Sequence, residues 1–306
     1  MNSQDLFIPG YLDLYRTGEL ERRAEEATTR LSHCAICAQV CKVNRLEGEI
    51  GVCRTGRLAV VSSCGQHYGE EDVLVGAGGS GTIFFANCNL ACVFCQNYDI
   101  SACGAGQETT SRHLADMMLN LQTRGCHNIN LVSPSHVVPQ ILEALVLAAG
   151  DGLEVPLVYN TGGYDALPTL RLLDGIVDIY MPDFKFADDE TGERLAGARR
   201  YSTVAKAAIR EMHRQVGDLI IDGAGIAHRG LMVRHLVMPN HLEDTRKITE
   251  FIAKEISADT YVNIMGQYRP AHLAQRYPEL ARPLKRTEHH QAISIARDAG
   301  LHRLAR

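Results

Sequence analysis

Several features of common protein classes are missing from this sequence of 306 residues. No apolar run approaches the roughly 20 residues of a membrane-spanning helix, so no membrane association is expected. The net charge of −5 provides no basic excess for general binding to nucleic acid or anionic lipid. Residues 1–16 lack the pattern of a signal peptide. These absences predict a cytoplasmic protein for which neither RNA nor DNA is the expected partner.

A dinucleotide-binding fingerprint is also absent. Gly76, Gly78, Gly79 and Gly81 are close together, but they do not follow a strand and open a helix as G-x-G-x-x-G requires. Cysteine, by contrast, is plentiful, with ten residues. In a chain without a secretory leader, clustered cysteines indicate metal binding or catalysis rather than a disulfide framework.

Three of these cysteines form a compact motif. Cys88, Cys92 and Cys95 have the spacing C-x3-C-x2-C and directly follow the apolar run 81–86. Soft thiolates favour zinc, copper(I) or an iron–sulfur cluster. A closed zinc site or a fully ligated [4Fe–4S] cluster takes four protein ligands, and the motif contains no fourth Cys or His. The motif therefore predicts either a distant fourth ligand or an iron with an open position.

A second set lies upstream, where Cys34, Cys37, Cys41 and Cys53 have the spacing C-x2-C-x3-C-x11-C. Four thiolates suffice for a tetrahedral zinc or for a second iron–sulfur cluster. The spacing does not choose between these metals, and four buried reduced cysteines are the alternative. A filled set of four indicates a structural site that stabilises a short segment with few core residues.

The rest of the chain alternates apolar runs with amphipathic segments. Expected strands cover 57–64, 82–86, 128–132, 155–159, 176–181, 231–237 and 260–264. Expected helices cover 12–31, 111–124, 136–149, 165–173, 201–217, 243–257 and 287–300. From residue 80 onward this repetition predicts an α/β fold with a parallel sheet, arranged as a partial (β/α)6 barrel. The expected division is a Cys-rich N-terminal segment (1–75), the barrel (76–265) and a C-terminal helical extension (266–306).

Polar residues follow the expected strands. Ligands of such sheets bind at the carboxyl ends of the strands, so these residues predict a site for a charged, polar small molecule. They are Ser133, Asn160, Thr161, Asp183, Lys185, Arg234, Gln267 and Tyr268. A substrate pocket is expected around His67, Glu70, Glu71, His136, Gln267 and Tyr268, although solvated or packing roles are open for each. No general acid or base is expected, so no catalytic residue is assigned beyond the cluster ligands.

The run Cys-Asn-Leu-Ala-Cys-Val-Phe-Cys-Gln-Asn at 88–97, placed after a first barrel strand, resembles the radical S-adenosylmethionine (radical SAM) enzymes. The resemblance extends from about 81 to 265. Within that superfamily it is nearest to the pyruvate formate-lyase activating enzymes, and to an uncharacterised subgroup with an upstream four-cysteine segment. The eight-cysteine insert of many glycyl-radical activators is missing.

The resemblance implies roles for individual residues. Cys88, Cys92 and Cys95 would bind three irons of a [4Fe–4S] cluster, and SAM would bind the fourth. Phe94 would pack near the adenine, and Lys185 of Asp183-Phe184-Lys185 would contact the SAM carboxylate. Four residues resemble positions that hold SAM and a monovalent cation in the activating enzymes, namely Met181, Asp183, Asn160 and Thr161. Those enzymes usually have Asp at the position of Asn160. Arg234 resembles an arginine that reaches SAM. Ser133 stands where many relatives have Gly-Gly-Glu.

The implied activity is reductive cleavage of SAM to a 5′-deoxyadenosyl radical, which abstracts hydrogen from a substrate. One hypothesis for that substrate is a glycine of a glycyl-radical partner protein. A second is a small molecule, a peptide or RNA. A third is a maturation or regulatory protein that binds zinc or an iron–sulfur cluster without radical turnover. An electron donor such as flavodoxin or ferredoxin is the implied partner of the enzyme hypotheses.

Overall fold

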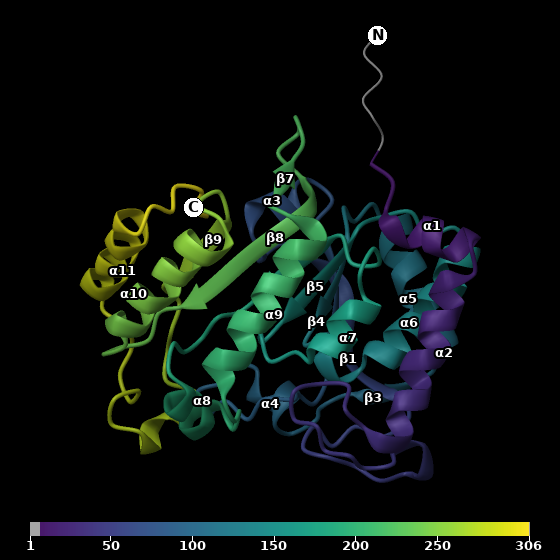
Figure 1. The fold of residues 1–306 in the computed structure, drawn as a ribbon, viewed down its shortest axis with the longest axis horizontal. Coiled ribbons are helices and arrows are strands. Elements are labelled where there is room, and N and C mark those ends of the chain that lie inside the picture. The colour runs from purple at the N-terminus through teal and green to yellow at the C-terminus, as the bar shows by residue number, and fades with distance from the viewer. Residues whose placement is uncertain (1–6, 306) are drawn as a thin grey trace.

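The computed structural model describes residues 7–305, so residues 1–6 of the expected N-terminal segment and residue 306 of the expected C-terminal extension lie outside it. Helices surround a central sheet, with α1 and α2 at one end of the molecule and α10 and α11 at the other (Figure 1). The helices are α1 (Gly10–Arg16), α2 (Glu19–Thr29), α3 (Asp72–Val75), α4 (Tyr98–Ser101), α5 (Ser111–Thr123), α6 (Val138–Gly150), α7 (Leu167–Leu172), α8 (Asp189–Ala196), α9 (Tyr201–Val216), α10 (Leu242–Phe251) and α11 (Arg286–Asp298).

The strands of the described chain form one nine-stranded sheet in the order β3-β1-β2-β4-β5-β6-β8-β7, with β9 paired to β8. Their bounds are β1 (Ala59–His67), β2 (Ser80–Phe85), β3 (Gln107–Thr109), β4 (Ile129–Val132), β5 (Leu157–Thr161), β6 (Ile179–Pro182), β7 (Ile220–Ile221), β8 (Ala227–Leu236) and β9 (Tyr261–Met265). The predicted barrel strands correspond to β2, β4, β5, β6, β8 and β9, and each pairs in parallel with the next. The predicted α/β class is confirmed.

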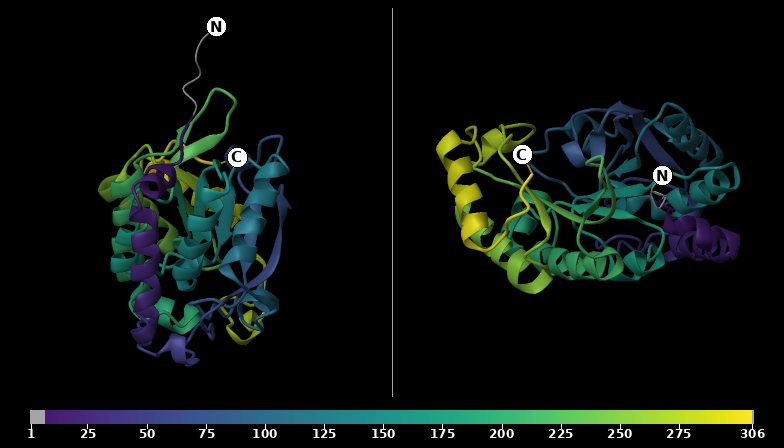
Figure 2. Two further views of the ribbon diagram at one scale, coloured as in Figure 1. Left: turned by 90° about the vertical axis from the view of Figure 1, so that its right-hand side faces the viewer. Right: turned by 90° about the horizontal axis from the view of Figure 1, so that it is seen from above.

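The parallel sheet does not close on itself among residues 7–305. Strand β1 pairs antiparallel with β2 at one side, and β9 pairs with β8 at the other. At least one helix follows each parallel strand, which gives the six expected β/α units. The view from above shows the first helices (purple) and the last helix (yellow) at opposite ends of the molecule (Figure 2).

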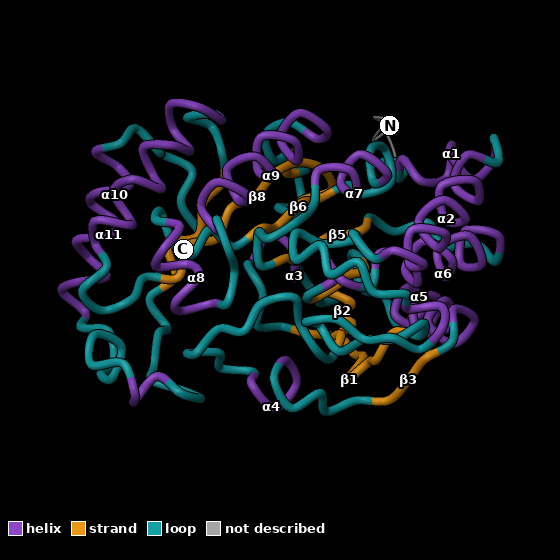
Figure 3. The backbone as a smooth tube through the Cα atoms, turned by 60° about the horizontal axis from the view of Figure 1, so that its bottom comes forward, coloured by secondary structure: helices purple, strands orange, loops and turns teal. Residues whose placement is uncertain are grey.

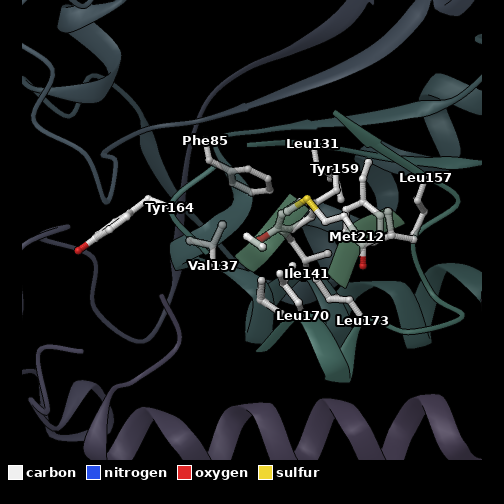
Figure 4. Close-up of a cluster of buried hydrophobic side chains, with 14 of the residues drawn as sticks. Phe85, Leu131, Val137, Ile141, Leu157, Tyr159, Tyr164, Leu170, Leu173 and Met212 are labelled. Carbon is white, nitrogen blue, oxygen red and sulfur yellow. The ribbon is translucent and has the colours of Figure 1, made fainter. Parts of the chain in front are cut away.

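The central strands are buried because both faces of the sheet are covered. Every residue of β5 is buried, as expected for parallel strands between layers. On the outer face, Phe85, Leu131 and Tyr159 pack against Ile141 of α6 and Leu170 of α7 (Figure 4). The inner face forms a second cluster of Leu74, Val158, Ile179, Met181, Leu219, Ala227 and Met232. Alternate residues of β6 therefore belong to different cores.

The expected single helix over 12–31 is wrong. It is divided into α1 and α2 at Gly18, whose φ of 75° is left-handed and ends the helical path. Both helices are amphipathic in pattern, and α2 packs against α6 through Leu20, Ala24 and Ala27. Helix α8 was not predicted. It is short, and Asp188 caps its first turn by accepting the Thr191 N–H at 2.8 Å.

The loops at the carboxyl ends of the parallel strands lie at one end of the molecule, together with α4 and α8 (Figure 3). A parallel sheet places these ends at one edge, which is where ligands of such folds bind. None of the helices in residues 7–305 has the length and apolarity needed to cross a membrane.

Candidate metal and cofactor site

The C-x3-C-x2-C motif lies on the loop that follows β2. Backbone bonds attach this loop to the end of α8, because Ala91 N–H donates to the Ala196 carbonyl at 2.8 Å and Val93 N–H donates to the Leu195 carbonyl at 2.9 Å. A third bond runs from Leu273 N–H to the Val93 carbonyl at 2.8 Å. The side chains of Leu90, Val93 and Phe94 are buried in the core. The loop is thereby held on both sides.

The three thiols border one cavity of about 260 Å³ at the carboxyl ends of the strands. Residues from five parallel strand ends complete its lining. They are Val132 and Ser133 after β4, Asn160, Thr161 and Gly162 at β5, Asp183 and Lys185 after β6, Arg234 and Leu236 on β8, and Met265 and Gln267 at β9. The structure thus brings together residues from most of the predicted strand ends and the cysteine loop.

An ionic network centred on Asp183 lines the same cavity as the cysteines. Lys185 Nζ lies 2.5 Å from Asp183 Oδ2, and Arg234 Nε lies 2.9 Å from Asp183 Oδ1. Burial raises the pKa of Asp183, but Arg234 and Lys185 more than offset it, so the pKa lies below its usual value. Burial opposes the charge on Lys185, yet Asp183 raises its pKa above the ordinary value. All three side chains are therefore charged at neutral pH.

Arg234 extends this network toward two further residues. Its NH2 group donates to Asn160 Oδ1 at 2.7 Å, and its NH1 group lies 3.4 Å from Glu70 Oε2. Asn160 stands at a position where the sequence resemblance implies Asp. An amide oxygen there accepts from Arg234 without adding a second negative charge beside Asp183.

Tyr201, at the start of α9, positions the ends of β5 and β6, and no motif in the sequence pointed to it. Its hydroxyl accepts the Lys185 N–H at 3.0 Å and lies 2.9 Å from the Gly162 carbonyl and 3.0 Å from the Asp183 carbonyl. The ring is fully buried. One side chain therefore holds the backbone at Gly162, Asp183 and Lys185.

Not every predicted cofactor residue borders the cavity. Phe94 does, and its ring packs edge-on against Phe186. Thr161 does as well, while its hydroxyl donates to the buried Asp165 carboxylate at 2.7 Å. Met181 does not, because strand alternation turns it into the inner hydrophobic cluster. The structure places it below the cavity rather than among its lining residues.

The predicted substrate-pocket residues divide into two groups. Glu70, Glu71 and Gln267 line a larger cavity of about 1160 Å³ beside β8 and β9. His67 lies outside that lining and contacts Phe84 edge-on. Tyr268 is buried and donates its hydroxyl to the Leu280 carbonyl at 2.7 Å, as expected of a packing residue. His136 is also buried, and it lies beside the N-terminal cysteines.

The four N-terminal cysteines border a small cavity of about 10 Å³. Arg45 and His136 line it as well. The Arg45 side chain is fully buried, with NH1 2.8 Å from the His136 carbonyl and 3.8 Å from Cys34 Sγ. Its NH2 and Nε groups donate to the Gly56 carbonyl at 2.8 and 3.0 Å. No ion pair joins Arg45 to a carboxylate within residues 7–305, so thiolates are the available counter-charge.

All ten cysteines are free thiols. Burial raises the pKa of Cys88 to about 11 and that of Cys92 further, so metal binding there must displace protons. In the described chain, no group of three or more His, Cys, Asp or Glu side chains is arranged to hold a single metal ion. In a [4Fe–4S] cluster each cysteine binds a different iron, so thiols that border a shared cavity fit a cluster better than one ion.

No profile of a known protein family matches the chain. A relative in Methanocaldococcus jannaschii, the uncharacterized protein MJ0674, is 34% identical over 293 residues, which cover 93% of this chain and 80% of the relative. Structures of SuiB from Streptococcus suis, free, bound to S-adenosylmethionine and bound to the precursor peptide SuiA, align with TM-scores of 0.46 to 0.48 at 10–12% identity. They cover 69–72% of this chain, which spans less than half of the SuiB chain. A likeness at that level assigns neither a fold family nor an activity.

Proposed function

We propose that this chain, which belongs to the same protein family as MJ0674 of M. jannaschii, is a radical SAM enzyme. The observation that carries the proposal is one cavity lined both by Cys88, Cys92 and Cys95 and by the Asp183–Lys185–Arg234 network. Three thiolates leave one iron of a [4Fe–4S] cluster without a protein ligand. When bound, the cluster and SAM supply one-electron cleavage of the sulfonium C–S bond and hydrogen abstraction from a substrate.

The chain's own residues would bind and orient the cofactor. Lys185 and Arg234 carry positive charge toward the cavity, which suits the carboxylate of SAM. Ser133 and Asn160 offer polar groups at neighbouring strand ends, and Phe94 supplies an apolar surface for an aromatic base. The Tyr201 hydroxyl accepts the backbone N–H of Lys185 and so keeps Lys185 in place.

A purely structural cluster accounts poorly for this arrangement. Placing Lys185, Asp183 and Arg234 at 12–15% side-chain exposure costs desolvation energy for three charges. A structural metal needs no such network, whereas a zwitterionic ligand does. This argument favours an enzyme over a metal-binding regulatory or maturation protein. A glycyl-radical partner and a flavodoxin or ferredoxin donor stay predictions from the sequence resemblance.

We further propose that Cys34, Cys37, Cys41 and Cys53 bind a structural metal, as a second cluster or as zinc, and zinc would require the four side chains to move closer together than they stand. The supporting observation is the buried Arg45 charge beside these thiols. An isolated buried cation is costly, and metal-bound thiolates would balance it, whereas four neutral thiols would not. Metal analysis of the anaerobically purified protein decides the identity, since a second cluster adds about four irons per chain and zinc adds none.

The decisive assay for radical SAM activity is release of 5′-deoxyadenosine and methionine from SAM by the reconstituted, chemically reduced protein. Cys92→Ala should lose the open cluster, seen in the visible and EPR spectra, and should lose SAM cleavage. Cys64→Ala is the matched control, because Cys64 is exposed and borders neither cysteine cavity. No release of 5′-deoxyadenosine by wild-type protein with an intact reduced cluster would reject the proposal.

A further inference from the structure

The larger cavity, of about 1160 Å³, lies directly beside the cavity of the three cysteines. Arg234, Met265 and Gln267 line both, so a molecule in the larger cavity would share these three residues with the cofactor site. Strand β9 and helix α11 form one wall. The turn between β1 and α3 forms another wall, which carries three consecutive carboxylates, Glu70, Glu71 and Asp72.

One of these carboxylates, that of Glu71, has an oxygen without a hydrogen-bond donor. Glu71 is only 9% exposed, and its Oε1 accepts the Asn263 side-chain N–H at 2.8 Å. Its Oε2 is buried and has no hydrogen-bond partner. A buried carboxylate oxygen without a donor is costly, and native proteins supply a partner for nearly all such atoms. Oε2 itself is covered, but Glu71 lines the cavity, so a rotation of its carboxylate would present Oε2 to a donor on a ligand there.

The charges around the larger cavity also favour a cationic ligand. Arg234 is the cation nearest to Glu70, but it already bonds Asp183 at 2.9 Å and Asn160 at 2.7 Å, and it reaches Glu70 only at 3.4 Å. The other guanidinium in the lining, Arg297, belongs to the exposed face of α11. Three adjacent carboxylates are therefore opposed by one shared cation and one exposed cation. The β1–α3 wall is left with net negative charge.

We propose that the larger cavity binds the substrate of the enzyme, and that this substrate carries an ammonium or guanidinium group held by Glu71 with Glu70. A cationic nitrogen supplies the donor that Glu71 Oε2 lacks and offsets the excess charge of this wall. The assignment of the ligand as substrate rests on the proposed radical SAM function, because it uses the contact between the two cavities. The cation preference itself rests on the geometry of Glu71 alone.

The test uses full-length protein without added substrate. 1,4-Diaminobutane and butylguanidine are titrated by calorimetry or ligand-observed NMR, with 1,4-butanediol as the uncharged comparator of the diamine. At least one cation should bind and the diol should not. Glu71→Gln should weaken cation binding about tenfold or more, since it removes a charge-assisted hydrogen bond. Glu108→Gln removes an exposed carboxylate outside the cavity and should leave binding unchanged.

Other outcomes overturn the proposal. It is wrong if neither cation binds, if the diol binds equally, or if Glu71→Gln binds like the wild type. It is also wrong if SAM and the cation exclude each other, because the carboxylates would then belong to the SAM site. Thermal unfolding checks that Glu71→Gln is folded, and Glu70→Gln on the same wall repeats the comparison if it is not. Cation binding that depends on Glu71 in a protein unable to cleave SAM would reject the enzyme proposal and keep the cation site.

Discussion

Replacing Asp183 by Asn tests whether charge balance holds the cofactor wall together. The substitution keeps the shape of the side chain but leaves the buried cations Lys185 and Arg234 without their shared partner. Two opposite charges about 4 Å apart attract by about 4 kcal/mol at an effective dielectric of about 20. Desolvation reduces the net value of such a pair, but removing one member of a buried pair costs about 3–5 kcal/mol. We expect a loss of about 3–5 kcal/mol in the free energy of unfolding.

For a chain of 306 residues, with an entropy of unfolding of about 2.1 cal/mol/K per residue, that loss corresponds to a fall of about 5–8 °C in Tm. The assay is thermal and urea unfolding of the metal-free protein, so that cofactor binding does not contribute. Asp116→Asn is the matched control, because Asp116 forms an exposed ion pair with Arg112 at 2.7 Å and should give little or no change. Adding Lys185→Met to Asp183→Asn should recover part of the loss. A loss under about 1 kcal/mol, or strict additivity of the two substitutions, would refute the charge-balance argument.

Three further predictions concern other parts of the molecule. Arg45→Met should lower the Tm of the metal-loaded protein more than that of the metal-free protein, because metal-bound thiolates attract the guanidinium. The difference should correspond to about 1–3 kcal/mol in the free energy of unfolding. Equal losses in both forms would argue against a metal at the four cysteines. Burial raises the pKa of Asp178 to about 7 although it accepts two backbone N–H groups. Between the unfolded pKa of about 3.9 and pH 7 the folded state holds the extra proton, so stability should fall as pH rises, by up to about 1.4 kcal/mol per pH unit. Asp178→Asn should flatten this slope in pH-dependent urea unfolding, and an unchanged slope would contradict the assignment. Tyr201→Phe should lower the free energy of unfolding by about 1–3 kcal/mol, because it leaves the Lys185 N–H without its acceptor. It should also weaken SAM binding in a direct titration. Unchanged binding would show that Lys185 does not need this support.

The sheet could be predicted from the sequence because parallel strands buried on both faces are short, continuous apolar runs between helical segments. That pattern located β2, β4, β5, β6, β8 and β9, with ends shifted by a few residues. The same reasoning placed polar residues such as Asn160, Asp183 and Arg234 at one edge, since parallel strands all end on the same side. The structure brings these three within hydrogen-bond distance of one another through Arg234.

What the sequence could not provide is the identity of contacts between distant segments. The hydroxyl of Tyr201 meets the backbone of Gly162 and Lys185 only after α9 has packed on the sheet. Arg45 and His136 are about ninety residues apart and meet at the N-terminal cysteines. His136 was expected in the substrate pocket because it follows β4. The short turn Pro134–His136 directs it to the cysteine segment instead.

Side-chain direction along a strand was the other source of error. Met181 follows Tyr180 on β6, and strand alternation sends the two side chains to opposite faces. A position near the end of a strand is therefore insufficient to place a residue in the site. Asp183 and Lys185 lie beyond the end of β6, where the backbone leaves the sheet and both side chains reach the cavity.

Arg234 gives the two proposed sites a physical connection. It divides its donors among Asp183, Asn160 and Glu70, and it lines both cavities. A cation bound at Glu70 competes with Arg234 for the same carboxylate, which leaves Arg234 more available to an anionic group in the cofactor cavity. Linkage then requires the reciprocal effect, so that SAM tightens binding of the cation by the same factor that the cation tightens binding of SAM. Glu70→Gln should weaken cation binding and remove this coupling, because Glu70, unlike Glu71, is within ion-pair distance of Arg234.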